Sequence, residues 1–201
     1  MNIEAKSIEI KALVELNIEN IDLSEIDMRV VAMSIARLNK VYLKWSRLTK
    51  HQIHWLFCEI KKVSGLEVFS LSHTDLSYLP DTTLTEAVCN SSLTRVILTN
   101  AGLSHAQCTT IFNHVDSSKL KALSVHGSDI HLVQAPLLSK PVNHLTSLNL
   151  WKTNLTHSQC SHLLQILPNS STLRNLNLGH VDLSQLPSQS LCYQHALQLV
   201  F

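Results

Sequence analysis

The sequence predicts an α/β solenoid in which a short strand and a helix alternate along the chain, each pair stacking on the one before. Two observations predict this fold. An eleven-residue frame, L-x-x-L-x-L-x-x-x-x-L with Ile or Val at some leucine positions, recurs along the chain, and apolar residues at helical spacing follow the copies. The seven copies begin at Leu13, Leu38, Leu66, Leu93, Leu120, Leu145 and Leu173, at intervals of 25, 28, 27, 27, 25 and 28 residues. One match to so loose a frame means little, but seven in register predict a repeat architecture.

The copy at residues 145–155, LTSLNLWKTNL, shows the frame most clearly. Side chains alternate between the two faces of a strand, so Leu148 and Leu150 are expected in the core and Asn149 and Trp151 on the exposed face. The mean interval of about 27 residues and the leucine spacing are those of a leucine-rich repeat. The first half of each copy is therefore expected to be a strand.

The second half of each copy indicates an outer helix. Three copies share the pattern L-[ST]-x-x-Q, in which Thr49, Ser104 and Thr156 stand where a helix N-cap is wanted. These are the even copies, and the odd copies carry a different pattern, so the chain also repeats in pairs of 53 or 54 residues. The residue two before the last frame leucine is never asparagine, which together with the long period favours helices on the outer face.

These alternating copies resemble the ribonuclease-inhibitor-like class of leucine-rich repeats over residues 13 to about 197. Similar arrays form the C-terminal part of NOD-like receptors and occur in substrate receptors of ubiquitin ligases and in bacterial effectors. The resemblance implies a horseshoe of about seven repeats, with parallel strands on the concave face and helices on the convex face. It also implies a protein-binding role, without naming the partner.

The whole chain, residues 1–201, is expected to form one leucine-rich repeat domain. Residues 1–12 are its N-terminal lead-in, residues 13–183 hold the repeat frames, and residues 184–201 are expected to be an imperfect or truncated terminal unit. No further frame is recognised after Leu173, and His195 stands where a core residue is expected. The chain ends with the apolar residues Leu197, Leu199, Val200 and Phe201. A solenoid end exposes its core unless a polar unit caps it, so this apolar end favours a fragment, a short isoform or a piece of a longer array.

Composition narrows the classes of function. The net charge of +1 argues against a nucleic-acid partner, which usually needs a strong basic surplus. No apolar run approaches the roughly 18 residues of a membrane span, and the polar start MNIEAKSIEIK is not a signal peptide. Five scattered cysteines favour a reducing compartment, and only four glycines leave no phosphate-binding loop. We therefore expect a cytoplasmic protein without a cofactor that binds neither nucleic acid nor membrane.

One cluster suggests enzyme chemistry. His51, His54 and Cys58 share one face of an expected helix and are the types of residue that bind zinc, so a zinc-dependent hydrolase is an alternative function. The competing interpretation is an ordinary amphipathic helix, in which Cys58 is a small apolar residue. Since no nucleophile and base converge elsewhere, we predict no catalytic residues, no metal site and no enzyme.

The candidate binding surface is the exposed side of the strands. Parallel pairing in register places Glu15 beside Lys40 and Glu19 beside Lys44, and these charges are expected to pair. Trp151 is expected to be the exposed aromatic, whereas Trp45 is either exposed or folded over the strand edge. Aromatic and arginine side chains dominate binding hot spots. The predicted partner-binding residues are Tyr42, Lys44, Trp45, Arg95, Ile97, His126, Asn149, Trp151 and Lys152.

The sequence as a whole predicts a non-catalytic protein–protein interaction module that binds its partner on the concave face. The predicted setting is the recognition part of a cytosolic sensor or adaptor of the innate-immune type. A substrate receptor of a ubiquitin ligase and a pathogen effector are the alternative settings.

Overall fold

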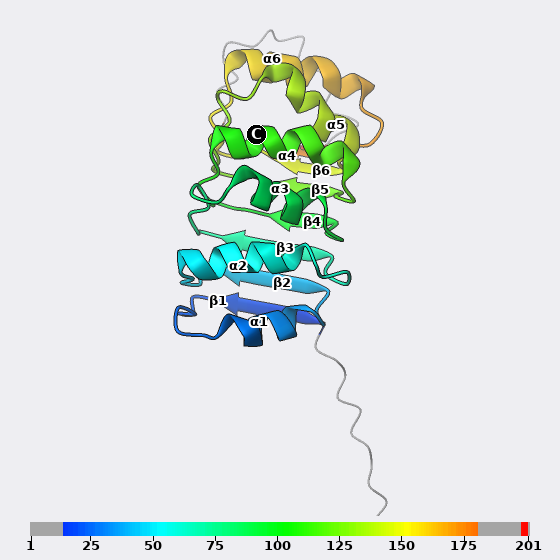
Figure 1. Cartoon of the computed structure of the whole chain (residues 1–201). Coiled ribbons are helices and arrows are strands. Elements are labelled where there is room, and N and C mark those ends of the chain that lie inside the picture. Colours follow the sequence, from blue (N-terminus) through cyan, green and yellow to red (C-terminus); the bar gives the residue numbers. More distant parts are fainter. Residues whose placement is uncertain (1–13, 181–197, 201) are drawn as a thin grey trace, which may run out of the picture.

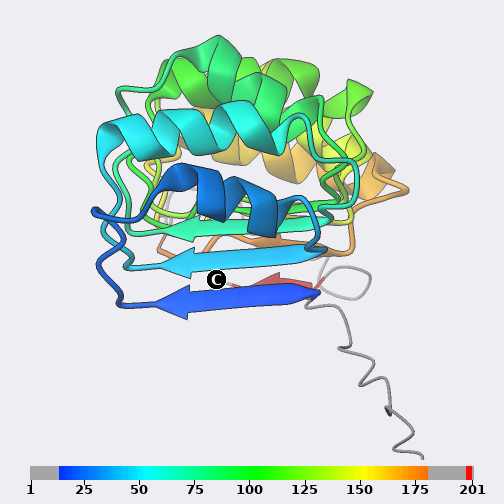
Figure 2. The ribbon, with the colours of Figure 1, turned by 60° about the horizontal axis from the view of Figure 1, so that its bottom comes forward.

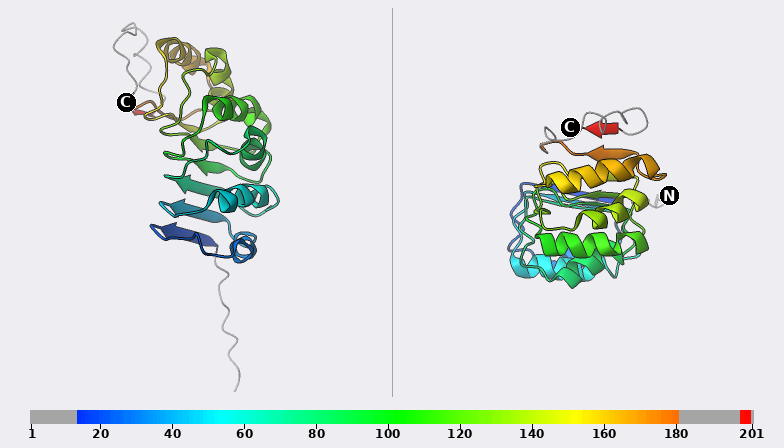
Figure 3. Two further views of the ribbon diagram at one scale, coloured as in Figure 1. Left: turned by 60° about the vertical axis from the view of Figure 1, so that its left-hand side comes forward. Right: turned by 90° about the horizontal axis from the view of Figure 1, so that it is seen from above.

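The computed structural model describes residues 14–180 and 198–200, and it confirms the leucine-rich repeat solenoid. The described strands form one parallel sheet of eight strands, which follow one another in chain order. The helices form a second layer along one side of this sheet (Figures 1 and 2), and Figure 3 shows the two layers from the side. Packed helices need about 8–10 Å per step and paired strands only about 4.8 Å, so the strand layer lies on the inner side of the curve.

The strands form where the leucine frame predicts them. Each of the first seven begins at the third residue of its frame, and neighbours pair in register, as Leu16 does with Val41. The fourth frame position points into the core, where Val41 is 0% and Leu148 1% exposed. The strands are β1 (Glu15–Glu19), β2 (Lys40–Lys44), β3 (Val68–Ser72), β4 (Arg95–Ile97), β5 (Ala122–Ser124), β6 (Ser147–Asn149) and β7 (Asn175–Asn177).

The helices alternate in length, in agreement with the paired repeat. The even copies carry the longer helices α2 (Lys50–Ile60), α4 (His105–His114) and α6 (His157–Ile166). The odd copies carry α1 (Met28–Ile35), α3 (Asp81–Cys89) and α5 (Ser139–His144). The short 3-10 helices η1 (Val115–Ser117), η2 (Ala135–Leu138) and η3 (Leu167–Asn169) complete the outer layer that the structure describes. Helix α5 is short because proline stands at its third residue, Pro141, and the preceding turn is the 3-10 helix η2.

The predicted N-caps of the even helices are confirmed. The side chains of Thr49, Ser104 and Thr156 each accept a hydrogen bond from the backbone N–H of the glutamine three residues later. The glutamine side chain accepts in return from the N–H of the cap residue, which completes a capping box. The shared L-[ST]-x-x-Q pattern thus begins each of the long helices.

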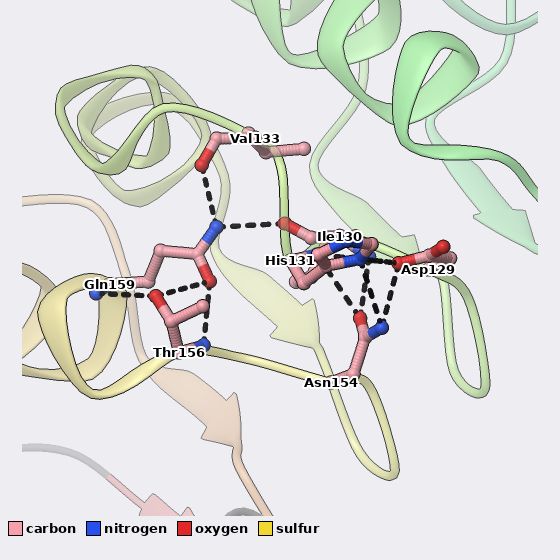
Figure 4. A network of polar contacts seen from close by, with 7 residues as sticks. All are labelled: Asp129, Ile130, His131, Val133, Asn154, Thr156 and Gln159. Carbon is pink, nitrogen blue, oxygen red and sulfur yellow. Dashed lines mark hydrogen bonds and ion pairs between the residues drawn. The ribbon is translucent and has the colours of Figure 1, made fainter.

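The same glutamines tie each even copy to the odd copy before it. Gln107 is 0% exposed, and its Nε2 donates to the carbonyls of Leu76 and Leu79, both at 2.8 Å. Because buried carbonyls need hydrogen-bond partners, one side chain stabilises a helix start and a neighbouring turn together. Gln52 does the same for the carbonyls of Leu23, Ser24 and Ile26. Gln159 does so for the carbonyls of Ile130 and Val133 (Figure 4).

A second tie joins the loops of the fifth and sixth copies, also drawn in Figure 4. Asn154 Nδ2 donates to Asp129 Oδ1 at 2.7 Å, and Asn154 Oδ1 accepts from the backbone N–H groups of Ile130 and His131 at 2.7 and 3.1 Å. Hydrogen bonds from His131 and then Asn154 lower the pKa of Asp129 below its ordinary value. The paired copies are therefore held together by polar bonds as well as by the core.

The C-terminal strand corrects one expectation. The sequence pattern shows no frame after Leu173, yet β8 (Gln198–Val200) continues the sheet and pairs with β7, with Leu199 opposite Leu176. The register starts an eighth frame at Ala196, only 23 residues (196 minus 173) after Leu173, and alanine at its first position hides the leucine pattern. The lead-in 1–12, the frame residue Leu13 and residues 181–197, with His195, lie outside the described residues.

Candidate protein-binding face

The inner face of the sheet is the candidate site, because the strand side chains that point away from the core lie on it. Both predicted ion pairs are present: Lys40 Nζ lies 3.4 Å from a carboxylate oxygen of Glu15, and Lys44 Nζ lies 2.8 Å from one of Glu19. All four side chains are about half exposed, so each pair contributes only about 0–1 kcal/mol. These charges satisfy one another across β1 and β2.

The middle of the inner face has a floor of small side chains. Ser70 and Ser124 are each 7% exposed and lie in register on either side of Ile97. Ile97 is half-buried and Arg95, on the same strand β4, is exposed as predicted. Small buried side chains beside a longer apolar side chain and a basic one are suited to contact with a protein partner rather than to catalysis.

The eighth residue of each of the seven frames has a left-handed backbone conformation, where the strand turns into its loop. Gly, Asn and His tolerate this region, whereas a bulky residue rarely adopts it, at a cost of about 1–2 kcal/mol. Trp45 is therefore a strained residue, and strain of this kind gathers at functional sites. The φ angles lie between 49° and 73° at Asn20, Trp45, His73, Asn100, Gly127, Lys152 and His180.

The first aromatic cluster, the Trp45 cluster, consists of Tyr42, Lys44, Trp45 and His73. Trp45 is 46% exposed, so of the two expectations for this residue exposure is the correct one. Its ring centroid lies 4.8 Å from that of His73, and Lys44 Nζ lies 4.3 Å from the Trp45 ring centroid. Tyr42 is half-buried on β2. The neighbouring copies thus hold the exposed indole in one orientation.

The second aromatic cluster, the Trp151 cluster, consists of His126, Trp151, Lys152, Gly179 and His180. The Trp151 ring lies edge-to-face between His126 and His180, with centroid distances of 4.2 and 4.7 Å. A Cβ atom on Gly179 would lie 2.2 Å from Trp151 Cδ1, so this glycine makes room for the indole. Trp151 is consequently half-buried, so the expectation that it is the exposed aromatic of this face is wrong. The more exposed tryptophan is Trp45. Lys152 is exposed beside it.

His126 is held in its uncharged form. Burial lowers the pKa of His126, and the positive charges of Lys152, His73 and His180 lower it further. Its Nε2 atom is buried and has no hydrogen-bond partner. At neutral pH the Trp151 cluster therefore presents an apolar imidazole edge rather than a cation.

The predicted residues form two clusters with a central strand between them, rather than one patch. The strands of Trp45 and Trp151 are four places apart in the sheet, about 19 Å at the usual strand spacing. Arg95 and Ile97 lie between them on β4. Asn149 Oδ1 accepts the backbone N–H of Trp151 at 2.9 Å, so this side chain shapes the turn of its own strand.

Sequence reasoning missed His73 and His180, which complete the two clusters. Both stand at the eighth frame position, just beyond the strand alternation that selected Tyr42, Arg95 and Asn149; at this position only Trp45 and Lys152 were chosen, as neighbours of strand candidates. The signal was present in the aligned copies: this position holds Asn, Gly or His in five of the seven frames, which indicates a left-handed turn.

The suggested zinc ligands do not converge on one point. His51 and His54 are exposed on α2, and Cys58 Sγ lies 3.7 Å from His54 Nε2. Within residues 14–180 and 198–200, no three His, Cys, Asp or Glu side chains are arranged to hold a metal ion. Cys108 and Cys160 are 0% and 1% exposed and belong to the core.

The fold and its paired copies are similar to those of ribonuclease-inhibitor-like leucine-rich repeat proteins. A comparison with curated proteins agrees. The chain is 25% identical to the ribonuclease inhibitor of Sus scrofa over 189 residues, which cover 89% of this chain and 41% of that relative. The chain thus spans about two fifths of the relative's length. No protein-family model matches the sequence.

The part of the chain that the structure describes holds no helix with the length and apolar character needed to cross a membrane.

Proposed function

We propose that this chain is a non-catalytic protein-binding module that takes its partner on the inner face of the sheet. The observation that carries the proposal is the Trp45 cluster, in which an exposed and conformationally strained tryptophan contacts a histidine and a lysine. Exposed Trp, Tyr and Arg residues supply most of the energy in protein interfaces. The Trp151 cluster and Arg95 extend this surface across five strands, from β2 to β6.

The mechanism is recognition by a rigid, preformed surface. Parallel strands in register fix the spacing of the anchors, and the glutamine ties hold successive copies together. A preformed surface loses little conformational entropy on binding, so more of the contact energy appears as affinity. The partner is a protein rather than a nucleic acid, since the net charge is only +1.

The setting we propose is the recognition part of a cytosolic sensor or adaptor of the innate-immune type. It is supported by the resemblance of the repeats to those of NOD-like receptors, which is an argument from fold alone. The relative from Sus scrofa is named for inhibiting ribonuclease, an enzyme that is itself a protein, and this supports the protein-binding role more directly than the setting.

Affinity capture with matched variants tests the proposed face. The chain is immobilised, and captured proteins are identified by mass spectrometry and compared with those retained by Trp151→Ala/Arg95→Ala. The control is Trp55→Ala/Arg29→Ala, which removes a half-buried tryptophan and an exposed arginine from the helix layer instead. We expect the inner-face variant to lose its partner and the helix-layer variant to keep it; the reverse pattern would remove the proposed face.

A further inference from the structure

A pocket of about 380 Å³ opens where the loops after β2 and β3 meet, beside the Trp45 cluster. Its walls come from two neighbouring copies, so the stacking of repeats creates it. Ile53 of α2, 3% exposed, belongs both to its lining and to the core. We call it the rim pocket; the residues that matter most for what it binds are Trp45, Arg47, Lys50, His73, Thr74 and Tyr78.

The charged residues of the rim pocket favour an anion. Arg47 and Lys50 line it, against the single carboxylate of Asp75. That carboxylate is already engaged, because Asp75 Oδ1 accepts the backbone N–H of Ser77 at 2.9 Å, and bonding to Ser77 holds the pKa of Asp75 below its ordinary value. Arg47 pairs with Asp22 at 3.4 Å, but its side chain remains 82% exposed and can reach a second anion.

Two aromatic walls give the pocket a fixed shape. Trp45 and His73 both line it and lie against each other. Tyr78 also lines the pocket: its hydroxyl donates to the carbonyl of Lys50 at 3.2 Å, and Lys50 Nζ lies 4.9 Å from the Tyr78 ring centroid. Burial raises the pKa of Tyr78 to about 12, so its hydroxyl keeps the proton that this bond requires.

The wall also contains a buried hydroxyl without a partner. Thr74 is 9% exposed, and its Oγ1 makes no hydrogen bond in the described structure. At the equivalent place in another copy, Thr153 Oγ1 donates to the carbonyl of Leu150 at 2.6 Å. Because buried polar groups are nearly always paired, this hydroxyl is available to a polar group of a ligand that enters the pocket.

We propose that the rim pocket binds the carboxylate side chain of an acidic segment of the protein partner. The inference rests on the proposed inner-face function, since Trp45 belongs both to the inner-face cluster and to the pocket wall. A partner seated on the Trp45 cluster places a neighbouring loop over the pocket, where two cations, two aromatic walls and a free hydroxyl match a glutamate or aspartate side chain.

Titration with a model peptide tests the assignment. The probe is a blocked peptide of alternating glutamate and alanine, followed through the indole N–H signal of Trp45 in ¹⁵N-labelled protein; Trp45→Phe assigns that signal. We expect saturable shifts with a dissociation constant on the order of 1 mM. The glutamine analogue of the peptide should bind about fivefold more weakly or worse, because it lacks the charge.

Two matched double variants locate the site. Arg47→Gln/Lys50→Gln should weaken peptide binding by about fivefold or more. The control, Lys119→Gln/Lys121→Gln, also removes two positive charges, but from exposed positions outside the pocket, and should change peptide binding by less than about twofold. Thr74→Val, which keeps the shape and removes the hydroxyl, should also weaken binding while circular dichroism shows an intact fold.

Three outcomes overturn the proposal: an unmoved Trp45 signal, equal losses in the two double variants, or equal binding of inorganic phosphate alone, which would make the pocket a general small-anion site. The titration needs no natural partner. Its failure therefore removes the acidic-segment assignment and leaves the inner-face function to the capture experiment.

Discussion

Replacing Gln107 with methionine is predicted to weaken the solenoid where an odd and an even copy meet. Gln107 is fully buried; its Nε2 donates to the carbonyls of Leu76 and Leu79, and its Oε1 accepts the N–H of Ser104 at 2.9 Å. Methionine fills a similar volume but makes none of these bonds. The Leu76 carbonyl keeps a bond from the Leu79 N–H, so the Leu79 carbonyl and the Ser104 N–H are the groups that lose the most.

The size of the effect follows from those two groups. A buried polar group left without its partner costs about 1–3 kcal/mol, and the half-buried Ser104 lies at the low end, so the free energy of unfolding should fall by about 2–4 kcal/mol. That is a large part of the roughly 5–15 kcal/mol that stabilises a natural domain. For a chain of this length the Tm should fall by about 4–16 °C. Urea and thermal unfolding followed by circular dichroism measure both quantities.

Gln107→Glu keeps the hydrogen-bond acceptor of this side chain, which completes the capping box, and removes the donor that bonds the neighbouring copy. Glutamate can still accept the Ser104 N–H and suits a helix N-terminus, but its carboxylate faces the carbonyls of Leu76 and Leu79. Burial of the carboxylate and the two facing carbonyls both make Gln107→Glu destabilising at pH 7, and the loss should shrink as the pH falls, because the protonated acid can donate to one carbonyl. Gln165→Met, at an exposed position of α6, is the control and should stay within about 0.5 kcal/mol of the wild type. A Gln107→Met variant as stable as that control would refute the reasoning.

Three further predictions follow from single contacts. Gly179→Ala should displace Trp151, change its fluorescence and lower the free energy of unfolding by about 1–3 kcal/mol. Gly65→Ala is the control and should have none of these effects, because a Cβ there meets nothing within 4 Å. Equal losses of stability in calorimetry would contradict this prediction. Lys152→Asn should raise the free energy of unfolding by about 0.5–1 kcal/mol in urea titrations, because asparagine tolerates the left-handed φ of 54°, and a loss of stability would count against strain there. Burial lowers the pKa of His126, so the unfolded chain binds a proton at this histidine more readily than the folded chain does. The free energy of unfolding should therefore decrease as the pH falls below about 6.5. His126→Gln should flatten that part of the dependence of unfolding free energy on pH, and an unchanged dependence would exclude His126 as the cause.

Periodic features of the fold were predictable from the sequence because each repeat shows them locally. Strand starts, core leucines and the three N-caps follow from spacing within one copy, and the structure confirms them. The second role of Gln107 was not predictable, since its carbonyl partners lie 28 and 31 residues earlier in the chain. The eighth frame escaped recognition because alanine at residue 196 removes its first leucine, while the backbone register of β8 does not depend on that leucine.

The candidate face was predicted as a set of positions, but its exposure depends on neighbouring copies. Trp45 and Trp151 stand only one frame position apart, eighth and seventh, yet two flanking histidines and a glycine enclose Trp151 while Trp45 remains open. Alternation along a strand cannot show which residue of the next copy lies against an indole. The rim pocket was likewise invisible to the sequence, because its walls come from two loops 28 residues apart, as the Lys50–Tyr78 bond illustrates.

Radical footprinting of the chain, free and bound to its captured partner, tests the binding face most directly. Tryptophan oxidation reports solvent access at three places: Trp45 and Trp151 on the inner face and Trp55 on α2 in the helix layer. If the inner face binds the partner, oxidation of Trp45 and Trp151 falls in the complex while that of Trp55 is unchanged. Protection of Trp55 with unchanged oxidation of Trp45 and Trp151 would contradict binding on the inner face.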